Sequence, residues 1–102
     1  MKLTKENFNE TIATGRILVS FGAQWCGYCR VLEPAVEEFA KKYSNIIKFA
    51  KVDVDEEEEL THQYHITTYP TFILFEEGVE IDRKTAANSI EELENMIKGP
   101  SD

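Results

Sequence analysis

The chain has 102 residues, of which 42% are apolar and 29% charged, and its formal net charge at pH 7 is -8. We expect a single domain over residues 1–102, because a chain of this length buries enough surface to fold without disulfides or metal ions. An acidic protein is repelled by nucleic acid and by anionic lipid, so neither is an expected partner. We expect the protein to be a monomer.

No targeting segment is recognisable at the start of the chain. Residues 1–7 contain lysines but no apolar stretch behind them, so they do not resemble a secretory signal peptide. No apolar run approaches the roughly 20 residues that a membrane-spanning helix needs. The expected compartment is therefore the cytoplasm.

The first half of the chain predicts a helix, a strand and a second helix. Thr4 is placed to cap a short first helix. The apolar run at 17–21 predicts a central strand that is covered on both faces. A helical pattern with one apolar stripe then covers residues 26–43. Pro34 lies inside this pattern and should kink the helix, since proline removes a backbone donor.

The second half continues the alternation and ends in a hairpin and a helix. The predicted elements are a strand at 46–54, a helix at 56–63, strands at 71–75 and 79–83, and a helix from the capping box at Ser89 to the stop at Gly99 and Pro100. A three-residue loop at 76–78 joins the last two strands. Alternating strands and helices predict an α/β fold with parallel strands, to which the hairpin adds antiparallel ones.

Both cysteines, Cys26 and Cys29, lie where the central strand ends and the long helix begins. A closed zinc site needs four ligands, and the other soft ligands, His62 and His65, lie far along the chain at a spacing unlike that of a zinc finger. A structural disulfide across so short a ring would contribute only about 2 kcal/mol and would join no two elements. A redox pair fits best, because a helix N-terminus stabilises a thiolate. Cys26 is then the exposed nucleophile and Cys29 the buried resolving thiol.

The acidic run at 53–59 allows a second metal hypothesis. Calcium prefers carboxylate ligands, but the run lacks the spaced ligands and the glycine of a calcium-binding loop. Acidic residues at the start of a helix also interact favourably with the helix dipole. We therefore interpret the run as a solvated helix start, and the two histidines that follow it as surface or packing residues.

Several segments together resemble the thioredoxin family over nearly the whole chain. They are Ile-Leu-Val-x-Phe-x-Ala-x-Trp-Cys-Gly-x-Cys at 17–29, Pro34, Lys51-Val52-Asp53, Tyr69-Pro70-Thr71 and Phe75-x-x-Gly78, all at thioredoxin-like spacing. The resemblance implies the thioredoxin fold, in which a central mixed β-sheet is flanked by helices on both faces. It also implies a cis-proline, Pro70, before the third long strand and facing the cysteines.

The resemblance implies a protein disulfide oxidoreductase that works by thiol–disulfide exchange. Its substrates would be protein disulfides, its only redox group the Cys26–Cys29 disulfide, and its electron donor a reductase such as thioredoxin reductase. Implied substrate-binding residues are Trp25, Gly27, Tyr28, Tyr69 and Pro70, and implied supporting residues are Ser20, Pro34 and Lys51. Two of these have a plainer interpretation: Trp25 as a core aromatic residue, and Tyr69-Pro70 as an ordinary turn.

The middle of the dithiol motif departs from the family pattern. Tyr28 stands where thioredoxins usually carry proline, and the Gly27-Tyr28 pair resembles that of bacterial periplasmic disulfide isomerases. An isomerase or oxidase is therefore the alternative to a reductase. A partner-binding module with incidental thiols is a third hypothesis.

Four further positions differ from the family around the dithiol. Ser20 replaces a buried aspartate that is thought to move the proton of the resolving cysteine, so Cys29 should attack more slowly or use water or another base. Lys51 then lacks its partner and should reach solvent or another carboxylate. Gly22 replaces a tryptophan, which should open the surface, and Ala86 replaces a glycine, which should narrow the substrate groove.

Overall fold

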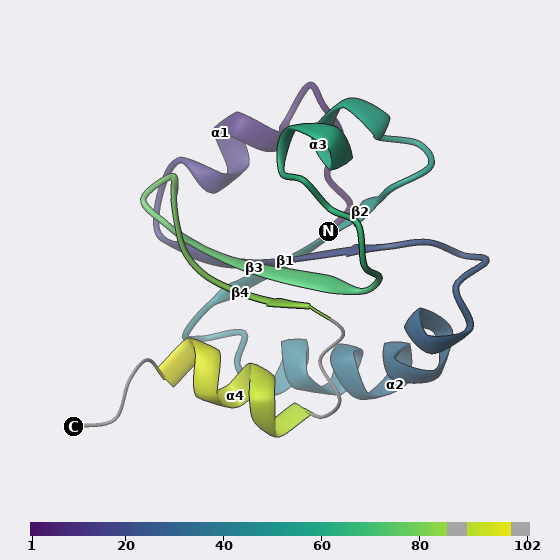
Figure 1. Ribbon diagram of the computed structural model, residues 1–102. Helices are drawn as coiled ribbons and strands as arrows, with labels where there is room; N and C mark the ends of the chain where they lie inside the picture. The colour runs from purple at the N-terminus through teal and green to yellow at the C-terminus, as the bar shows by residue number, and fades with distance from the viewer. Residues whose placement is uncertain (86–89, 99–102) are drawn as a thin grey trace.

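The computed structural model describes residues 1–85 and 90–98, and within them helices and strands follow one another in the predicted order (Figure 1). The elements are α1 (Phe8–Ile12), β1 (Arg16–Gly22), α2 (Gly27–Lys42), β2 (Lys48–Asp53), α3 (Glu58–Gln63), β3 (Thr71–Glu76), β4 (Val79–Thr85) and α4 (Ile90–Lys98). The capping box at Ser89, the stop at Gly99 and Pro100, and Ala86 lie outside the described residues.

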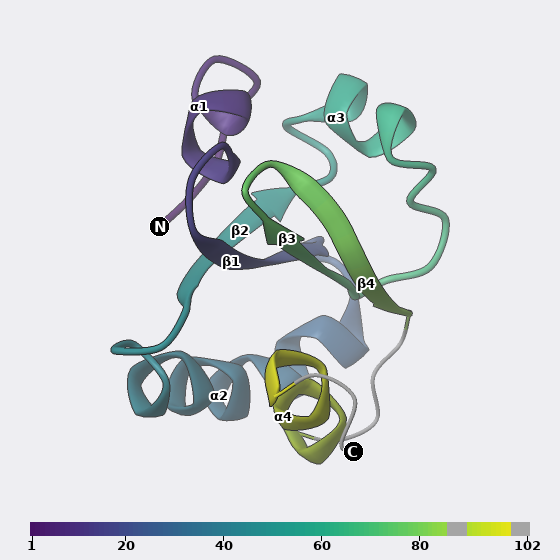
Figure 2. The ribbon, with the colours of Figure 1, turned by 90° about the vertical axis from the view of Figure 1, so that its left-hand side faces the viewer.

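The strands form one sheet in the order β2-β1-β3-β4, with α1 and α3 on one face and α2 and α4 on the other (Figures 1 and 2). The predicted mixed sheet with helices on both faces is confirmed. Within this sheet β1 and β2 pair in parallel, whereas β3 runs antiparallel to both β1 and β4. The expected parallel pairing of β3 is wrong because the segment at 54–70 returns the chain to the sheet edge where β2 ends: Asp53 lies opposite Gly22, and Thr71, the first residue of β3, lies opposite Phe21.

The central strand β1 separates two apolar clusters. Ile17, Val19 and Phe21 pack among residues of α1 and α3, and Leu18 packs among residues of α2 and α4. None of the four side chains has exposed surface. The prediction of a strand covered on both faces is confirmed, and each of these side chains contributes about 1.5–3 kcal/mol by burial.

Two local predictions are wrong in detail. The carbonyl of Thr4 accepts hydrogen bonds from the N–H groups of Asn7 and Phe8, and the Asn7 side chain accepts one from the Thr4 N–H at 2.8 Å. This turn delays the start of α1 to Phe8. The hairpin loop has two residues rather than three, and both Glu77 and Gly78 have positive φ angles, of 50° and 84°. Such a turn matches the twist of the strands that it joins.

Helix α2 runs through Pro34 as one helix, and the predicted kink at this residue stays a prediction. The Tyr69–Pro70 peptide bond, directly before β3, is cis. None of the helices within residues 1–85 and 90–98 is both long and apolar enough to cross a membrane.

Candidate active site

The two cysteines occupy the first turn of α2. Cys26 is the N-cap residue, and its Sγ accepts a hydrogen bond from the Cys29 N–H at 3.3 Å. A side chain at this position takes up one of the N–H groups that a helix leaves unpaired at its start. Both thiols are free and half-buried. The structure thus places the dithiol at the strand–helix junction that the sequence indicates.

Hydrogen bonding and burial separate the pKa values of the two thiols. Burial acts to raise the pKa of Cys26, but hydrogen bonds from the Cys29 side chain and from the backbone of Cys29 and Tyr28 outweigh it, so the pKa of Cys26 is lowered. Burial, and then the hydrogen bond to Cys26, raises the pKa of Cys29 to about 11. Of the two thiols, Cys26 is therefore the one that ionises at the lower pH, and Cys29 keeps its proton at neutral pH.

Trp25 lies on the surface beside the dithiol, with 63% of its surface exposed, so its interpretation as a core aromatic residue is wrong. Its Nε1–H donates a hydrogen bond to Asp55 Oδ2 at 2.6 Å, and its ring packs edge-on against Tyr69 with the centroids 5.7 Å apart. Sequence reasoning missed Asp55, which it treated as part of a solvated helix start. The pairing of the strands could have indicated this contact. Because β1 and β2 are parallel neighbours, the segments that follow them, with Trp25 and Asp55, leave the same edge of the sheet.

The loop before β3 reaches the dithiol from the other side. The Cys26 Sγ lies 3.9 Å from the Tyr69 carbonyl oxygen, within reach of a weak S–H hydrogen bond. Pro70, the last residue of this loop, is buried. The fold thus brings Tyr69 to Cys26 across 43 residues of sequence.

Of the other residues expected at the site, some lie next to the dithiol and others lie away from it. Gly27 is an exposed residue at the start of α2, and Tyr28 is 37% exposed next to it. Pro34 is exposed further along the same helix. His62 and His65 are exposed at and after the end of α3, and no group of three or more metal-ligating side chains occurs in the part of the chain that the structure describes.

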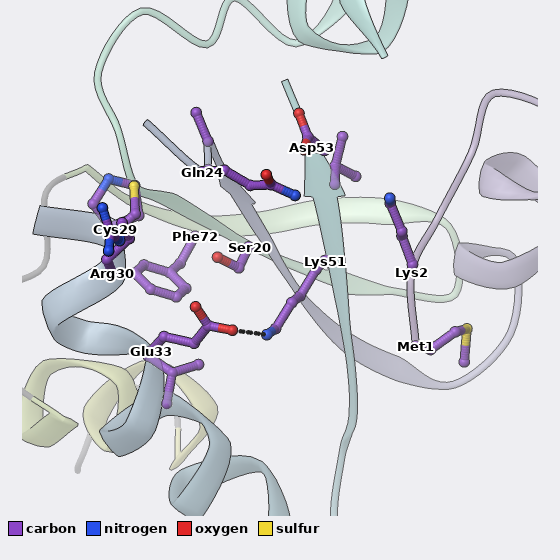
Figure 3. Close-up of a pocket in the computed structure, with 15 residues that line it drawn as sticks. Met1, Lys2, Ser20, Gln24, Cys29, Arg30, Glu33, Lys51, Asp53 and Phe72 are labelled. Carbon is purple, nitrogen blue, oxygen red and sulfur yellow. Dashed lines mark hydrogen bonds and ion pairs between the residues drawn. The ribbon is translucent and has the colours of Figure 1, made fainter. Parts of the chain in front are cut away.

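A half-open cleft of about 810 Å³ lies between α2 and the sheet, next to Cys29 (Figure 3). Two small residues of β1 on the side that faces α2, Ser20 and Gly22, line it. A Cβ atom at Gly22 would lie 3.3 Å from the Cys29 Sγ. Gly22 and Cys29 both line the cleft, and the expected opening of the surface at Gly22 stays a prediction.

Lys51 crosses this cleft from β2 to α2. Its Nζ lies 3.2 Å from Glu33 Oε1 and 3.7 Å from Glu37 Oε1. The expectation that Lys51 reaches another carboxylate is confirmed. Its side chain is 41% exposed, so each ion pair contributes less than about 1 kcal/mol to stability and acts mainly on orientation. Sequence reasoning did not single out Glu33, although its position four residues after Cys29 places it on the same helix face.

A mixed sheet flanked by helices, with two thiols in the first turn of one helix, defines a class of thiol–disulfide oxidoreductases. The thioredoxin family model matches residues 1–99, and the chain belongs to the thioredoxin family. It is accordingly a dithiol–disulfide oxidoreductase with protein-disulfide reductase activity. Family membership implies disulfide substrates and reductase partners in general.

Individual relatives agree with this assignment. The thioredoxin of Alicyclobacillus acidocaldarius is 40% identical over 95% of this chain and 93% of its own. The solved structure of Plasmodium falciparum thioredoxin has a TM-score of 0.85 at 34% identity, covering 95% of both chains. That of Fasciola hepatica thioredoxin has a TM-score of 0.79 at 39% identity, covering 91% of this chain and 88% of that one. These structures confirm the predicted thioredoxin fold.

Proposed function

We propose that this protein reduces disulfide bonds in other proteins, with Cys26 as the nucleophile and Cys29 as the resolving thiol. The observation that carries the proposal is the N-cap position of Cys26, which directs backbone N–H groups at its sulfur and lowers its pKa. Cys29, one turn further along α2, keeps its proton until the second step.

The proposed reaction has two steps. The Cys26 thiolate attacks one sulfur of the substrate disulfide, whose S–S bond breaks, and the departing substrate thiolate takes a proton from solvent. Cys29 then loses its proton and attacks the Cys26 Sγ, which releases the second substrate thiol. The substrate gains two electrons and the protein keeps a Cys26–Cys29 disulfide. A reductase of the thioredoxin reductase kind returns two electrons to it.

The proposed docking surface surrounds Cys26. Trp25, Gly27 and Tyr28 supply exposed surface on one side, and the segment of Tyr69 and cis-Pro70 supplies the other. Main-chain groups of Tyr69 would pair with an extended substrate segment. We propose that the chain acts as one monomeric domain in the cytoplasm, with Ser20, Pro34 and Lys51 in supporting positions.

A trapping experiment tests these roles. Purified Cys29→Ser protein, incubated with oxidised proteins, should accumulate mixed disulfides on Cys26 that a reducing agent releases. The Cys26→Ser protein is the matched control and should trap far less. Equal trapping by both variants would contradict the proposed division of roles. Full biological activity of Cys26→Ser would favour the binding-module hypothesis instead.

An isomerase or oxidase is the second candidate, and the observation that favours it is Tyr28 at the position of the usual proline. The reduction potential of the Cys26–Cys29 pair separates the two functions. A reductase needs a low potential, as in thioredoxin at about -270 mV, whereas an oxidant such as DsbA lies near -120 mV. A strongly oxidising potential would exclude the reductase assignment.

A further inference from the structure

In the reduced dithiol the pKa of Cys29 is raised to about 11, so this thiol starts out protonated at neutral pH and must lose its proton for the second step. A proton acceptor near Cys29 would remove this obstacle. Among the described residues, the charged side chains that line the cleft at Cys29 are those of Lys2, Arg30, Glu33, Lys51 and Asp53. The candidates for a proton acceptor are therefore the two carboxylates, on α2 and on β2.

The carboxylate of Asp53 has a structural task. Its Oδ1 accepts hydrogen bonds from the N–H groups of Asp55 and Glu56, at 2.9 and 3.3 Å, and so fixes the turn that leads to α3. Glu33, in contrast, lies four residues after Cys29 on α2. Residues at this spacing are neighbours on one helix face, with Cβ atoms about 5–6 Å apart.

The ion pair with Lys51 fixes the Glu33 carboxylate at the cleft. Figure 3 shows Cys29 and Glu33 on the α2 wall, and Lys51 reaching Glu33 from β2 on the opposite wall. Ser20, the register neighbour of Lys51 on β1, lies between these walls but is a very poor base near neutral pH. Glu37 also approaches Lys51, at 3.7 Å, but it does not line the cleft.

The cleft also gives water access to the thiol. A volume of about 810 Å³ holds several water molecules, each of which occupies about 30 Å³ in the liquid. Gly22 has no side chain to separate the Cys29 Sγ from this space. We infer that Glu33 accepts the proton of Cys29 through water in the cleft, and that Lys51 is the residue that positions Glu33. This inference rests on the proposed roles of Cys26 and Cys29.

The proton and the electron pair of the Cys29 S–H bond go to different atoms. The S–H bond of Cys29 breaks, and its proton passes through water to the Glu33 carboxylate. The electron pair left on the Cys29 Sγ forms the bond to the Cys26 Sγ as the bond from Cys26 to the substrate sulfur breaks. The substrate leaves as a thiolate and is protonated by solvent. Glu33 then returns its proton to solvent through the open cleft.

The test separates the two steps with an aromatic disulfide probe, 5,5′-dithiobis(2-nitrobenzoate). Attack by Cys26 releases one coloured thiolate at a rate proportional to probe concentration, and attack by Cys29 releases the second at a first-order rate. Stopped-flow absorbance follows both releases in the whole reduced protein, in Glu33→Gln and in Glu37→Gln. The Cys29→Ser protein should release only the first thiolate, which tests the proposed function separately.

We expect Glu33→Gln to slow the second release at neutral pH on the order of 100-fold, since a positioned proton acceptor contributes about 100-fold or more in many enzymes. The difference in this rate between Glu33→Gln and the unaltered protein should shrink as the pH approaches 11, where solvent deprotonates Cys29 directly. The first release should not change. Glu37→Gln should resemble the unaltered protein. A normal second release in Glu33→Gln, an equal loss in Glu37→Gln, or a deficit that persists at high pH would each overturn the inference.

Discussion

The indole N–H of Trp25 donates a hydrogen bond to the carboxylate of Asp55 at 2.6 Å, and this contact ties the segment after β1 to the segment after β2. The acceptor is charged, which makes such a bond stronger than one between neutral groups. Trp25 is otherwise exposed, so Asp55 and the ring of Tyr69 are what hold its indole beside Cys26.

Removal of this contact should weaken substrate docking. We expect Asp55→Ala to lower kcat/KM for a protein disulfide about 3- to 10-fold, since a hydrogen bond to a charged group contributes about 1.5–3 kcal/mol and solvent replaces part of it. Trp25 is the only tryptophan, so a fall in its fluorescence anisotropy reports directly on the freed side chain. Glu58→Ala, in the same acidic run, is the control. An unchanged anisotropy in Asp55→Ala would contradict the expected role.

The rate of Cys26 alkylation should follow its lowered pKa. Only the thiolate reacts with iodoacetamide, so the rate should rise with pH, level off, and have its midpoint below the ordinary thiol value. Cys29→Ala removes a side-chain donor to Cys26 and should move the midpoint upward, whereas Cys29→Ser keeps a donor and should move it less. Cys29 itself should be alkylated in quantity only as the pH nears 11. A midpoint at or above the ordinary value in the unaltered protein would be the contrary result.

The sequence predicted features that depend on local pattern. The buried strand β1 and the helix that begins at the cysteines follow from an apolar run and a helical pattern, whereas the proximity of Tyr69 to Cys26 was implied by the resemblance to the thioredoxin family. The predicted direction of β3 was wrong because it depends on the path of the segment at 54–70, which returns to the sheet edge where β2 ends, and no apolar pattern encodes that path.

The missed site residues are surface carboxylates whose partners lie on other elements. Asp55 stands in a run of acidic residues that look alike in sequence, and only the parallel pairing of β1 and β2 selects it as the partner of Trp25. Glu33 has the right spacing from Cys29, but its orientation depends on Lys51, which comes from β2. Patterns within one segment do not contain such information.

Gly22→Ala tests the access to Cys29 from the cleft. The added Cβ would lie 3.3 Å from the Cys29 Sγ, a close contact that the thiol must move to relieve. We expect the second thiolate release from the aromatic disulfide probe to slow several-fold, with the first release unchanged. The free energy of unfolding should fall by no more than about 1–3 kcal/mol, as for a small overpacked site. A second release at the normal rate would show that Gly22 does not control this access.

Ser20→Asp should supply a proton acceptor from the sheet. Ser20 lies on the α2-facing side of β1, between its register neighbours Lys51 and Phe72, and it lines the cleft with Cys29. A carboxylate there would have the Lys51 ammonium nearby, which favours its ionised form. We expect faster attack by Cys29 near neutral pH, and a larger gain when Glu33→Gln is also present, because the new carboxylate would then replace the missing acceptor.

Ser20→Asn is the matched control, since asparagine has nearly the shape of aspartate but cannot take up a proton near neutral pH. Insulin reduction measured against pH gives the rate profile for the complete cycle, and the first-order release from the aromatic probe isolates the Cys29 step. The increase in the rate of attack by Cys29 in Ser20→Asp should be largest near neutral pH. It should vanish toward pH 11, where Cys29 ionises without a proton acceptor from the protein. An unchanged rate profile in Ser20→Asp, or an equal gain in Ser20→Asn, would show that proton transfer at this position does not limit the resolving step.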